Sequence, residues 1–208
     1  MEHTVICIGR QYGSGGREIG ERLARKLDIS YYDKLLIKKT AEISGLSEEY
    51  IGREEEKPVH PLWFLSGNIF ADTAGIKAAF YSGSEVIYRA EKAAIEQIAR
   101  RESCVIIGRS ASEILKDEGC YSVFIYANEQ DRIARVSARN GIGEKEASER
   151  IRRIDKMRRQ YFDANSASGW GKPESYDLLL SSSRFGVETC ADLIASALSM
   201  SEGGGCHE

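Results

Sequence analysis

Short apolar segments alternate along this chain with longer stretches in which apolar residues recur every three or four positions. The short segments have the length and content of buried β-strands, and the longer stretches have the periodicity of amphipathic helices. Strands that alternate with helices indicate a parallel sheet covered on both faces, an α/β sandwich of three layers. The predicted strands cover 4–8, 29–33, 104–108, 121–127 and 176–181. The predicted helices cover 34–44, 86–100, 129–139, 144–162 and 187–200, besides one that follows the first strand and one that starts at Ser47.

Between 54 and 83 this regular pattern loosens. An acidic run is followed there by prolines and by large aromatic side chains among glycines. Such a stretch is typical of an insertion that covers a substrate, of a surface that binds a partner, or of a small hydrophobic cluster under a long loop. The residues leave these alternatives open.

The joint between the first strand and the helix after it carries a glycine-rich turn, Gly13-Ser14-Gly15-Gly16. Glycines there let several backbone N–H groups turn toward one point, and the following helix directs the positive end of its dipole at the same point. A phosphate group can bind such a cluster of amides without the help of any one side chain. A turn that only connects strand to helix is the plainer alternative.

The turn departs from a standard P-loop, GxxxxGK[ST], in which a lysine binds the β- and γ-phosphates and a hydroxyl binds magnesium. Alignment on Gly15 places Gly16 at the lysine position, with Arg17 and Glu18 near the hydroxyl position. Either Arg17 or another arginine supplies the missing cation, or the turn binds a ligand less demanding than a triphosphate. A dinucleotide-binding GxGxxG motif with Asp33 as the ribose-binding acid is also conceivable, but Glu18 stands where that motif needs glycine or alanine.

The 208 residues suffice for one domain, which we expect over 1–200 with a flexible tail over 201–208. With 42% hydrophobic and 29% charged residues, the composition is that of an ordinary globular protein. No apolar segment is long enough to cross a membrane and the N-terminus lacks the pattern of a signal peptide, so we expect a cytoplasmic protein. The net charge of -3 provides no general attraction to nucleic acid or to anionic membranes.

The chain has five cysteines and three histidines. An odd number of cysteines without a CxxC pair favours free thiols over a disulfide framework or a zinc site. The histidines lie in terminal or irregular stretches and form no cluster with the cysteines. We therefore expect no metal site built from protein side chains.

Two further strand ends carry chemical groups that accompany the glycine turn. Asp33 follows the second strand, and Arg109 follows the third. The carboxyl ends of parallel strands meet at one edge of the sheet, which is where ligands bind in such folds. Arg109 is placed for bidentate binding of a phosphate, although it could also be an ordinary surface arginine. Asp33 could instead cap the helix that begins at Lys34.

Positive charge is concentrated between 132 and 159. This stretch holds ten lysines and arginines against four acids, and ten less four leaves +6 in an otherwise acidic chain. Two or three of these side chains would neutralise a polyphosphate if the helix closed over it. A solvated helix face is the plainer alternative, and a nucleic-acid surface is the third, although no aromatic side chains are interleaved to support it.

These segments together resemble the cytidylate kinase-like family, a branch of the P-loop nucleoside monophosphate kinases. The resemblance extends over most of the chain. It implies a P-loop kinase fold with a helical monophosphate-binding insertion at 38–100 and a lid at 140–172. The segments that carry it are RQYGSGGREIG, YYDKLLI, SGLSEEYI, VIIGRSASEIL, FIYANEQDRIARV, RIRRIDKMRRQYF and WGKPESYDLLLSSSRFG.

The resemblance also implies an ATP-dependent phosphotransferase, with CMP or dCMP as the first candidate acceptor and Mg²⁺ bound mostly through nucleotide oxygens. Asp33 is similar to the acid that organises the acceptor nucleotide. Arg109 is similar to the arginine of the family's GRD segment, in which Ser110 replaces the aspartate here. The residues that fall near the family's lid arginines are Arg153, Arg158 and Arg159. The residues expected at the ATP phosphates are Gly13, Ser14, Gly15, Gly16, Arg17 and Glu18.

In the mechanism that this resemblance implies, the N–H groups of 13–16 bind the phosphates, Arg17 replaces the absent lysine, and the lid arginines neutralise the transition state. Ser14 or Asp33 assists the magnesium ion. Gly16 in place of lysine supports a second hypothesis, a catalytically silent nucleotide-binding module that signals to a partner by closing its lid. Nucleotides are the expected partners under both hypotheses, and the sequence leaves open whether the chain forms a homo-oligomer.

Overall fold

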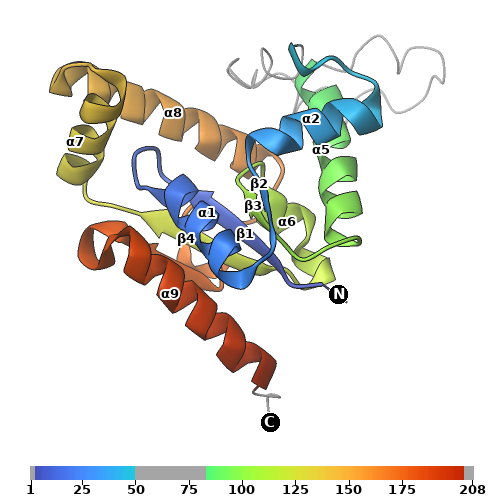
Figure 1. The fold of residues 1–208 in the computed structure, drawn as a ribbon. Coiled ribbons are helices and arrows are strands. Elements are labelled where there is room, and N and C mark those ends of the chain that lie inside the picture. Colours follow the sequence, from blue (N-terminus) through green and yellow to red (C-terminus); the bar gives the residue numbers. More distant parts are fainter. Residues whose placement is uncertain (1–2, 50–82, 204–208) are drawn as a thin grey trace.

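The computed structural model describes residues 3–49 and 83–203, and its centre is a sheet of five strands in the order β2-β3-β1-β4-β5 (Figure 1). All four strand pairings in this sheet are parallel. The five predicted strands and the α/β class are therefore confirmed. The strands are β1 Val5–Arg10, β2 Ser30–Tyr32, β3 Cys104–Ile107, β4 Tyr121–Tyr126 and β5 Leu178–Ser181.

Helices connect these strands in the described segments. They are α1 Gly16–Leu27, α2 Lys34–Ser44, α5 Gly83–Ala99, α6 Ala111–Ile114, α7 Glu129–Asn140, α8 Glu144–Ala164 and α9 Ser182–Gly203, with the short 3₁₀ helices η2 Lys116–Glu118 and η3 Pro173–Ser175. Only α6 and the two 3₁₀ helices lie outside the predicted helical stretches. The helix predicted to start at Ser47 begins at residues 48 and 49; its remainder and almost all of the irregular stretch at 54–83 lie outside the described residues.

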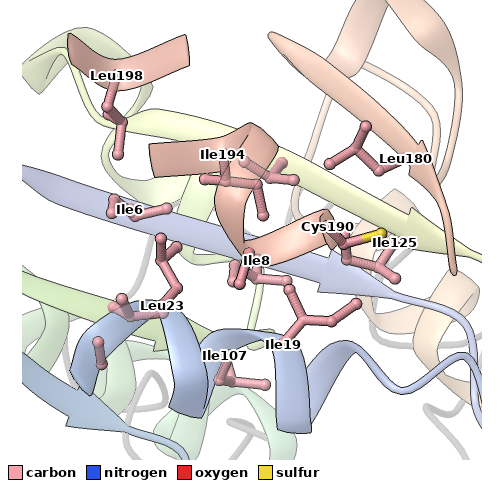
Figure 2. Close-up of a cluster of buried hydrophobic side chains, with 14 residues drawn as sticks. Ile6, Ile8, Ile19, Leu23, Ile107, Ile125, Leu180, Cys190, Ile194 and Leu198 are labelled. Atoms are coloured by element: carbon pink, nitrogen blue, oxygen red, sulfur yellow. The ribbon is translucent and has the colours of Figure 1, made fainter. Parts of the chain in front are cut away.

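One face of the sheet is covered by α1 and α9. Ile6 and Ile8 of β1 point to this face and pack against Ile19 and Leu23 of α1 and against Ile194 of α9 (Figure 2). All five side chains are at most 1% exposed. The helical repeat of apolar residues in α1 therefore buries one stripe of the helix against the sheet.

The opposite face is covered by α2, α5 and the segment that contains α6. Val5 and Cys7 alternate with the residues that face α1, as the two-residue repeat of a strand requires. They belong to a second buried cluster with Leu36 of α2, Ile95 of α5 and Leu115. The sheet thus lies between two helical layers, as predicted.

The first strand continues two residues beyond its predicted end. Gly9 and Arg10 pair with Phe124 and Ile125 of β4. The run of apolar residues ends at Ile8, so this extension depends on the neighbouring strand and not on the local sequence pattern.

The last helix also differs from its predicted range of 187–200. It begins at Ser182, and Gly186 interrupts its helical backbone with φ 77° and ψ 173°. Helical structure continues to Gly203, three residues into the predicted tail. The other residues of that tail lie outside the described residues.

Helices α7 and α8 lie together at one end of the molecule, and α8 runs from there toward α5 (Figure 1). Ile133 and Val136 of α7 pack with Ala147 and Ile151 of α8 in a separate buried cluster. Near the other end of α8, the ring of Tyr161 packs edge-on against Tyr88 of α5, with centroids 6.2 Å apart. The segment predicted as a lid, 140–172, therefore consists mainly of α8.

The cysteines in the described segments are free, and three of the four are buried. Within 3–49 and 83–203 no group of histidine, cysteine and carboxylate side chains could hold a metal ion. No helix of these segments combines the length and the apolar composition that a membrane span requires.

Candidate active site

The glycine turn leaves the carboxyl end of β1 and enters α1 at Gly16. Gly13 and Gly15 adopt left-handed backbone conformations, with φ 80° and 81°, that other residues rarely adopt. No side chain caps the N-terminus of α1. Within the described part of the chain, the N–H groups of Gly13, Gly15 and Gly16 have no hydrogen-bond acceptor. Unused donors at a helix N-terminus are the geometry of an anion site.

The carbonyl groups of the turn are held by side chains from later in the sequence. The donors are Arg132 Nε to the carbonyl of Tyr12 (2.8 Å), Arg135 Nη1 to that of Gly13 (2.5 Å) and Ser182 Oγ to that of Ser14 (2.6 Å). The C=O and N–H groups of a trans peptide point in opposite directions. Because the carbonyls of Tyr12 and Ser14 are bound in this way, the N–H groups of Gly13 and Gly15 turn to the other side.

Helix α8 binds the turn through Asp155. This carboxylate accepts a hydrogen bond from the N–H of Tyr12 (2.7 Å) and pairs with Arg132 of α7. The Tyr12 ring also lies within cation–π distance of two guanidinium groups, those of Arg139 (5.1 Å) and Arg158 (5.5 Å). The shape of the turn therefore depends on α7 and α8.

Arg10, the last residue of β1, is a site residue that the sequence analysis does not single out. A Cβ added to Gly16 would lie 2.7 Å from Arg10 Cβ, and one added to Gly108 would lie 2.7 Å from Arg10 Cζ. The Arg10 side chain therefore runs from the start of α1 to the turn after β3. Burial, and then the charge of Arg158, lower the pKa of Arg10 to about 9, so the guanidinium is charged at neutral pH. A signal was present in the sequence, because Arg10 stands where GxxxxGK has its first glycine.

Arg17 and Asp33, both predicted site residues, form an ion pair with 2.5 Å between Nε and Oδ2. The side chain of Asp33 is 12% exposed and that of Arg17 is 55% exposed. Asp33 precedes α2 but makes no side-chain capping hydrogen bond, so the ion pair replaces the helix cap that was its alternative role. Glu18 pairs instead with Arg22, one turn further along α1 (2.7 Å).

Arg109 follows β3 and lies in a buried network of polar side chains. Its guanidinium pairs with the carboxylate of Glu91 on α5, which is 1% exposed, and the hydroxyl of Tyr161 on α8 donates to the same carboxylate. Burial, and then the negative charge of Glu91, raise the pKa of Tyr161 well above its usual value. Arg109 and Ser110 have positive φ angles of 57° and 52°, and such strain in non-glycine residues is concentrated at functional sites.

The three predicted arginines of α8 occupy different surroundings. Arg158 Nη1 donates to the carbonyl of Arg10 (3.1 Å), and burial lowers the pKa of Arg158. Arg159 is exposed and lies over the ring of Trp170 (5.7 Å). Arg153 is also exposed. The structure therefore brings Arg158 to the glycine turn and leaves the other two on the outer surface of the helix.

The geometry of this site agrees with the comparisons between this chain and known proteins. The model of the cytidylate kinase-like family matches residues 5–184, a range that includes all five strands and the glycine turn. The chain belongs to this family. The comparison with curated proteins found no match.

Solved structures share the fold of this cytidylate kinase-like chain, among them the following two. An uncharacterized protein from Eubacterium ventriosum is 26% identical, with 95% of this chain and 99% of that chain covered and a TM-score of 0.70. Shikimate kinase from Bacteroides thetaiotaomicron is 13% identical, with 94% and 98% covered and a TM-score of 0.53. The second likeness concerns the fold alone.

Substitution of Gly13 tests whether the backbone of the glycine turn contributes to stability and to nucleotide binding. A Cβ there would lie 2.9 Å from Val136 Cγ2 and 3.0 Å from the carbonyl oxygen of Arg132. A left-handed alanine also costs about 1 to 2 kcal/mol. We expect Gly13→Ala to lower the free energy of unfolding by more than the ~1 to 2 kcal/mol of the backbone cost alone, because the new methyl group also meets Val136 and the Arg132 carbonyl. It should weaken Mg-ADP binding about tenfold, the equivalent of ~1.4 kcal/mol. Chemical denaturation and calorimetry measure the two effects.

Gly119→Ala is the matched control. Gly119 has nearly the same φ, 78°, but nothing lies within 4 Å of an added Cβ. Gly119→Ala should lower the free energy of unfolding by the cost of a left-handed alanine alone and should leave the affinity for Mg-ADP unchanged. Equal affinities in the two variants would contradict the role of Gly13.

Proposed function

We propose that this protein is a phosphotransferase that moves the γ-phosphoryl group of ATP to a small acceptor, with a nucleoside monophosphate such as CMP or dCMP as the first candidate. The observation that carries the proposal is the set of unused N–H groups at the start of α1, with Arg10 and Arg158 beside them. Phosphoryl transfer depends on positioning and on positive charge around the moving group. Membership of the cytidylate kinase-like family supports the same reaction class.

In this proposal the N–H groups of 13–16 bind the β- and γ-phosphates. An acceptor phosphate oxygen forms a bond to the γ-phosphorus while the bond from that phosphorus to the β-phosphate oxygen breaks, and ADP leaves. An acceptor phosphate is already ionised at neutral pH, so the step needs no strong base. Asp33 and Arg109 bind and orient the acceptor, and arginines of α8, with Arg158 foremost, neutralise the transition state as the segment 140–172 closes and excludes water.

Magnesium supplies charge compensation between the phosphate groups when it is bound with the nucleotide. Hydroxyl and carboxylate oxygens suit this ion, and we propose that Ser14 or Asp33 assists it while nucleotide oxygens and water provide most ligands. Ser14 is fully buried at the turn, and its hydroxyl donates to the carbonyl of Gln11 (2.8 Å). Asp33 is held by Arg17.

A second candidate is a catalytically silent nucleotide-binding module. One specific observation favours it, the presence of Gly16 where the standard P-loop has its lysine. Both candidates bind nucleotide, and only the first releases ADP.

A coupled ADP-release assay with Mg-ATP separates the two candidates. The acceptors tested should be a panel of nucleoside monophosphates and, because of the fold shared with shikimate kinase, the hydroxyl acceptor shikimate. We expect acceptor-dependent turnover of about 1 to 100 per second, as is usual for kinases. Calorimetric binding of Mg-ATP without turnover for any acceptor would favour the silent module. Absence of binding would reject both candidates.

A further inference from the structure

The two ends of the glycine turn differ from the standard P-loop in a reciprocal way. The motif GxxxxGK begins with glycine and has its lysine at the seventh position. This chain reads RQYGSGG over the same seven positions, with Arg10 at the first and Gly16 at the seventh. The turn has no cation at its seventh position, Gly16, and has one at its first position, Arg10.

The side chain of Arg10 occupies the space in which a side chain at Gly16 would begin. A Cβ on Gly16 would lie 2.7 Å from Arg10 Cβ and 3.1 Å from Arg10 Cγ. Real Cβ atoms do not approach backbone-proximal carbons so closely, since interiors are packed at van der Waals distance. A lysine at position 16 and an arginine at position 10 therefore exclude each other in this backbone.

The turn after β3 makes room for the other end of Arg10. A Cβ on Gly108 would lie only 1.6 Å from Arg10 Nη1, so the guanidinium rests directly against this glycine. Gly108 also has a positive φ of 75°. Strands β1 and β3 are neighbours in the sheet, so their carboxyl ends bring the two residues together.

The guanidinium of Arg10 differs from its neighbours in its charge balance. Arg17 pairs with Asp33, and Arg109 pairs with Glu91. In 3–49 and 83–203 no carboxylate forms an ion pair with Arg10. The Arg10 side chain begins beside Gly16, whose N–H group is unused in the described segments, and its guanidinium lies against Gly108. A charged guanidinium without an ion pair at this edge of the sheet has the chemistry to bind phosphate oxygens in a bidentate manner.

We infer that Arg10 supplies, from the first position of the turn, the positive charge that a lysine supplies from the seventh, and that its guanidinium binds the terminal phosphates of the nucleoside triphosphate. This assignment rests on the proposed function for its catalytic consequence. It replaces Arg17 in the role of the missing lysine and leaves Arg17 beside Asp33 on the acceptor side. The ligand chemistry concerned is the polyphosphate chain and not the base.

Variants that remove the positive charge at position 10, or move it to position 16, test the assignment. Arg10→Ala should lower kcat/KM for ATP by about 10²- to 10³-fold, the usual effect of removing one transition-state donor. Gly16→Lys alone should also lose activity, because the new side chain meets Arg10. The double variant Arg10→Gly/Gly16→Lys restores the standard motif and should recover at least tenfold over Arg10→Ala. No recovery in a folded double variant would count against the exchange of positions.

Arg17→Ala distinguishes the two candidate cations. We expect it to act mainly on the KM for the acceptor, with a smaller loss in kcat/KM for ATP than Arg10→Ala produces. The reverse ranking would overturn the assignment to Arg10. Arg25→Ala, which removes an exposed arginine of α1 paired only weakly with Glu21 (3.5 Å), controls for loss of charge on this helix.

A binding readout separates this inference from the proposed function. Inorganic triphosphate should raise the melting temperature of the wild type and of Arg25→Ala but not of Arg10→Ala; Arg10→Gln, which keeps the length of the side chain, replaces the alanine variant if that fails to fold. A wild type that binds triphosphate through Arg10 but turns over no acceptor would remove the proposed function and leave the assignment standing. If the wild type is active and its Arg10 variants match it in turnover and in triphosphate binding, the assignment to Arg10 is rejected and the proposed function stands.

Discussion

Replacing Asp155 with alanine should lower the free energy of unfolding by about 3 to 5 kcal/mol, the usual cost of removing one partner from a buried ion pair. The side chain of its partner, Arg132, is only 8% exposed and would lose its carboxylate. The N–H of Tyr12 would lose its acceptor at the same time. Since both contacts hold the glycine turn, affinity for Mg-ADP should fall about 100-fold, a change worth ~2.7 kcal/mol. Urea denaturation and calorimetry measure these effects.

Glu149→Ala is the control on the same helix, because Glu149 is exposed. Surface substitutions of this kind change stability by no more than about 0.5 kcal/mol. The stability of Asp155→Asn should lie between those of Asp155→Ala and Glu149→Ala. Its amide oxygen can still accept a hydrogen bond from the N–H of Tyr12, but it has no charge to pair with Arg132. If Asp155→Ala were no less stable than Glu149→Ala, α8 would not hold the turn in the way described.

Replacing Glu91 with alanine is the second substitution with a large expected effect, again about 3 to 5 kcal/mol in the free energy of unfolding. The side chains of Glu91 and Arg109 are 2% and 14% exposed, so the change leaves a largely buried guanidinium without this carboxylate. Tyr161 loses its hydrogen-bond acceptor as well. Loss of the Glu91 carboxylate should also alter the position of the Arg109 guanidinium and so raise the KM for the acceptor. Denaturation and steady-state kinetics measure the two consequences.

Glu85→Ala is the matched control, because it removes another carboxylate of α5 that pairs with a surface arginine, Arg89, at 2.9 Å. Exposed pairs contribute about 0 to 1 kcal/mol. Tyr161→Phe removes only the hydroxyl and should cost less than Glu91→Ala, and Glu91→Gln serves if the alanine variant does not fold. Equal stability of Glu85→Ala and Glu91→Ala would show that the buried network contributes nothing beyond a surface pair.

The two networks attach α8 at two places. Asp155 joins it to the glycine turn, and Tyr161 joins it through Glu91 to α5 and Arg109. If 140–172 acts as a lid, its movement changes the glycine turn through the first contact and the surroundings of Arg109 through the second. Coupling between the sites would then appear as a change in acceptor KM for Asp155→Asn.

Local sequence signals account for the fold and for the glycine turn. The apolar repeats of α1 and β1 specify which side faces the sheet, because burial follows the period of each element. Gly13 and Gly15 mark the turn because their left-handed backbone favours glycine. The strand after residue 28 and the arginine after β3 are likewise evident from neighbouring residues alone.

The same signals could not rank the arginines. The sequence motifs assign the role of the missing lysine to Arg17. They do not distinguish Arg153, Arg158 and Arg159 from one another. In the structure Arg158 contacts the turn and Arg17 is paired with Asp33. Arg10 lies beyond the apolar run that ends at Ile8, and only the pairing with β4 makes it part of β1. Local periodicity has no information about which guanidinium meets which carboxylate, since that depends on contacts between distant segments.

The sequence by itself determined the alternation of strands and helices, the site of the glycine turn and membership of a kinase-like family, because each depends on patterns within a few residues or on a run of motifs in order. Only the tertiary structure decided which charges surround that turn. Tyr12 and Asp155 are 143 positions apart, and Arg10 meets Gly108 only because β1 and β3 are adjacent in the sheet. Electrostatic interactions fall with distance in space and not with separation along the chain, so the order of the strands selects the residues of the site.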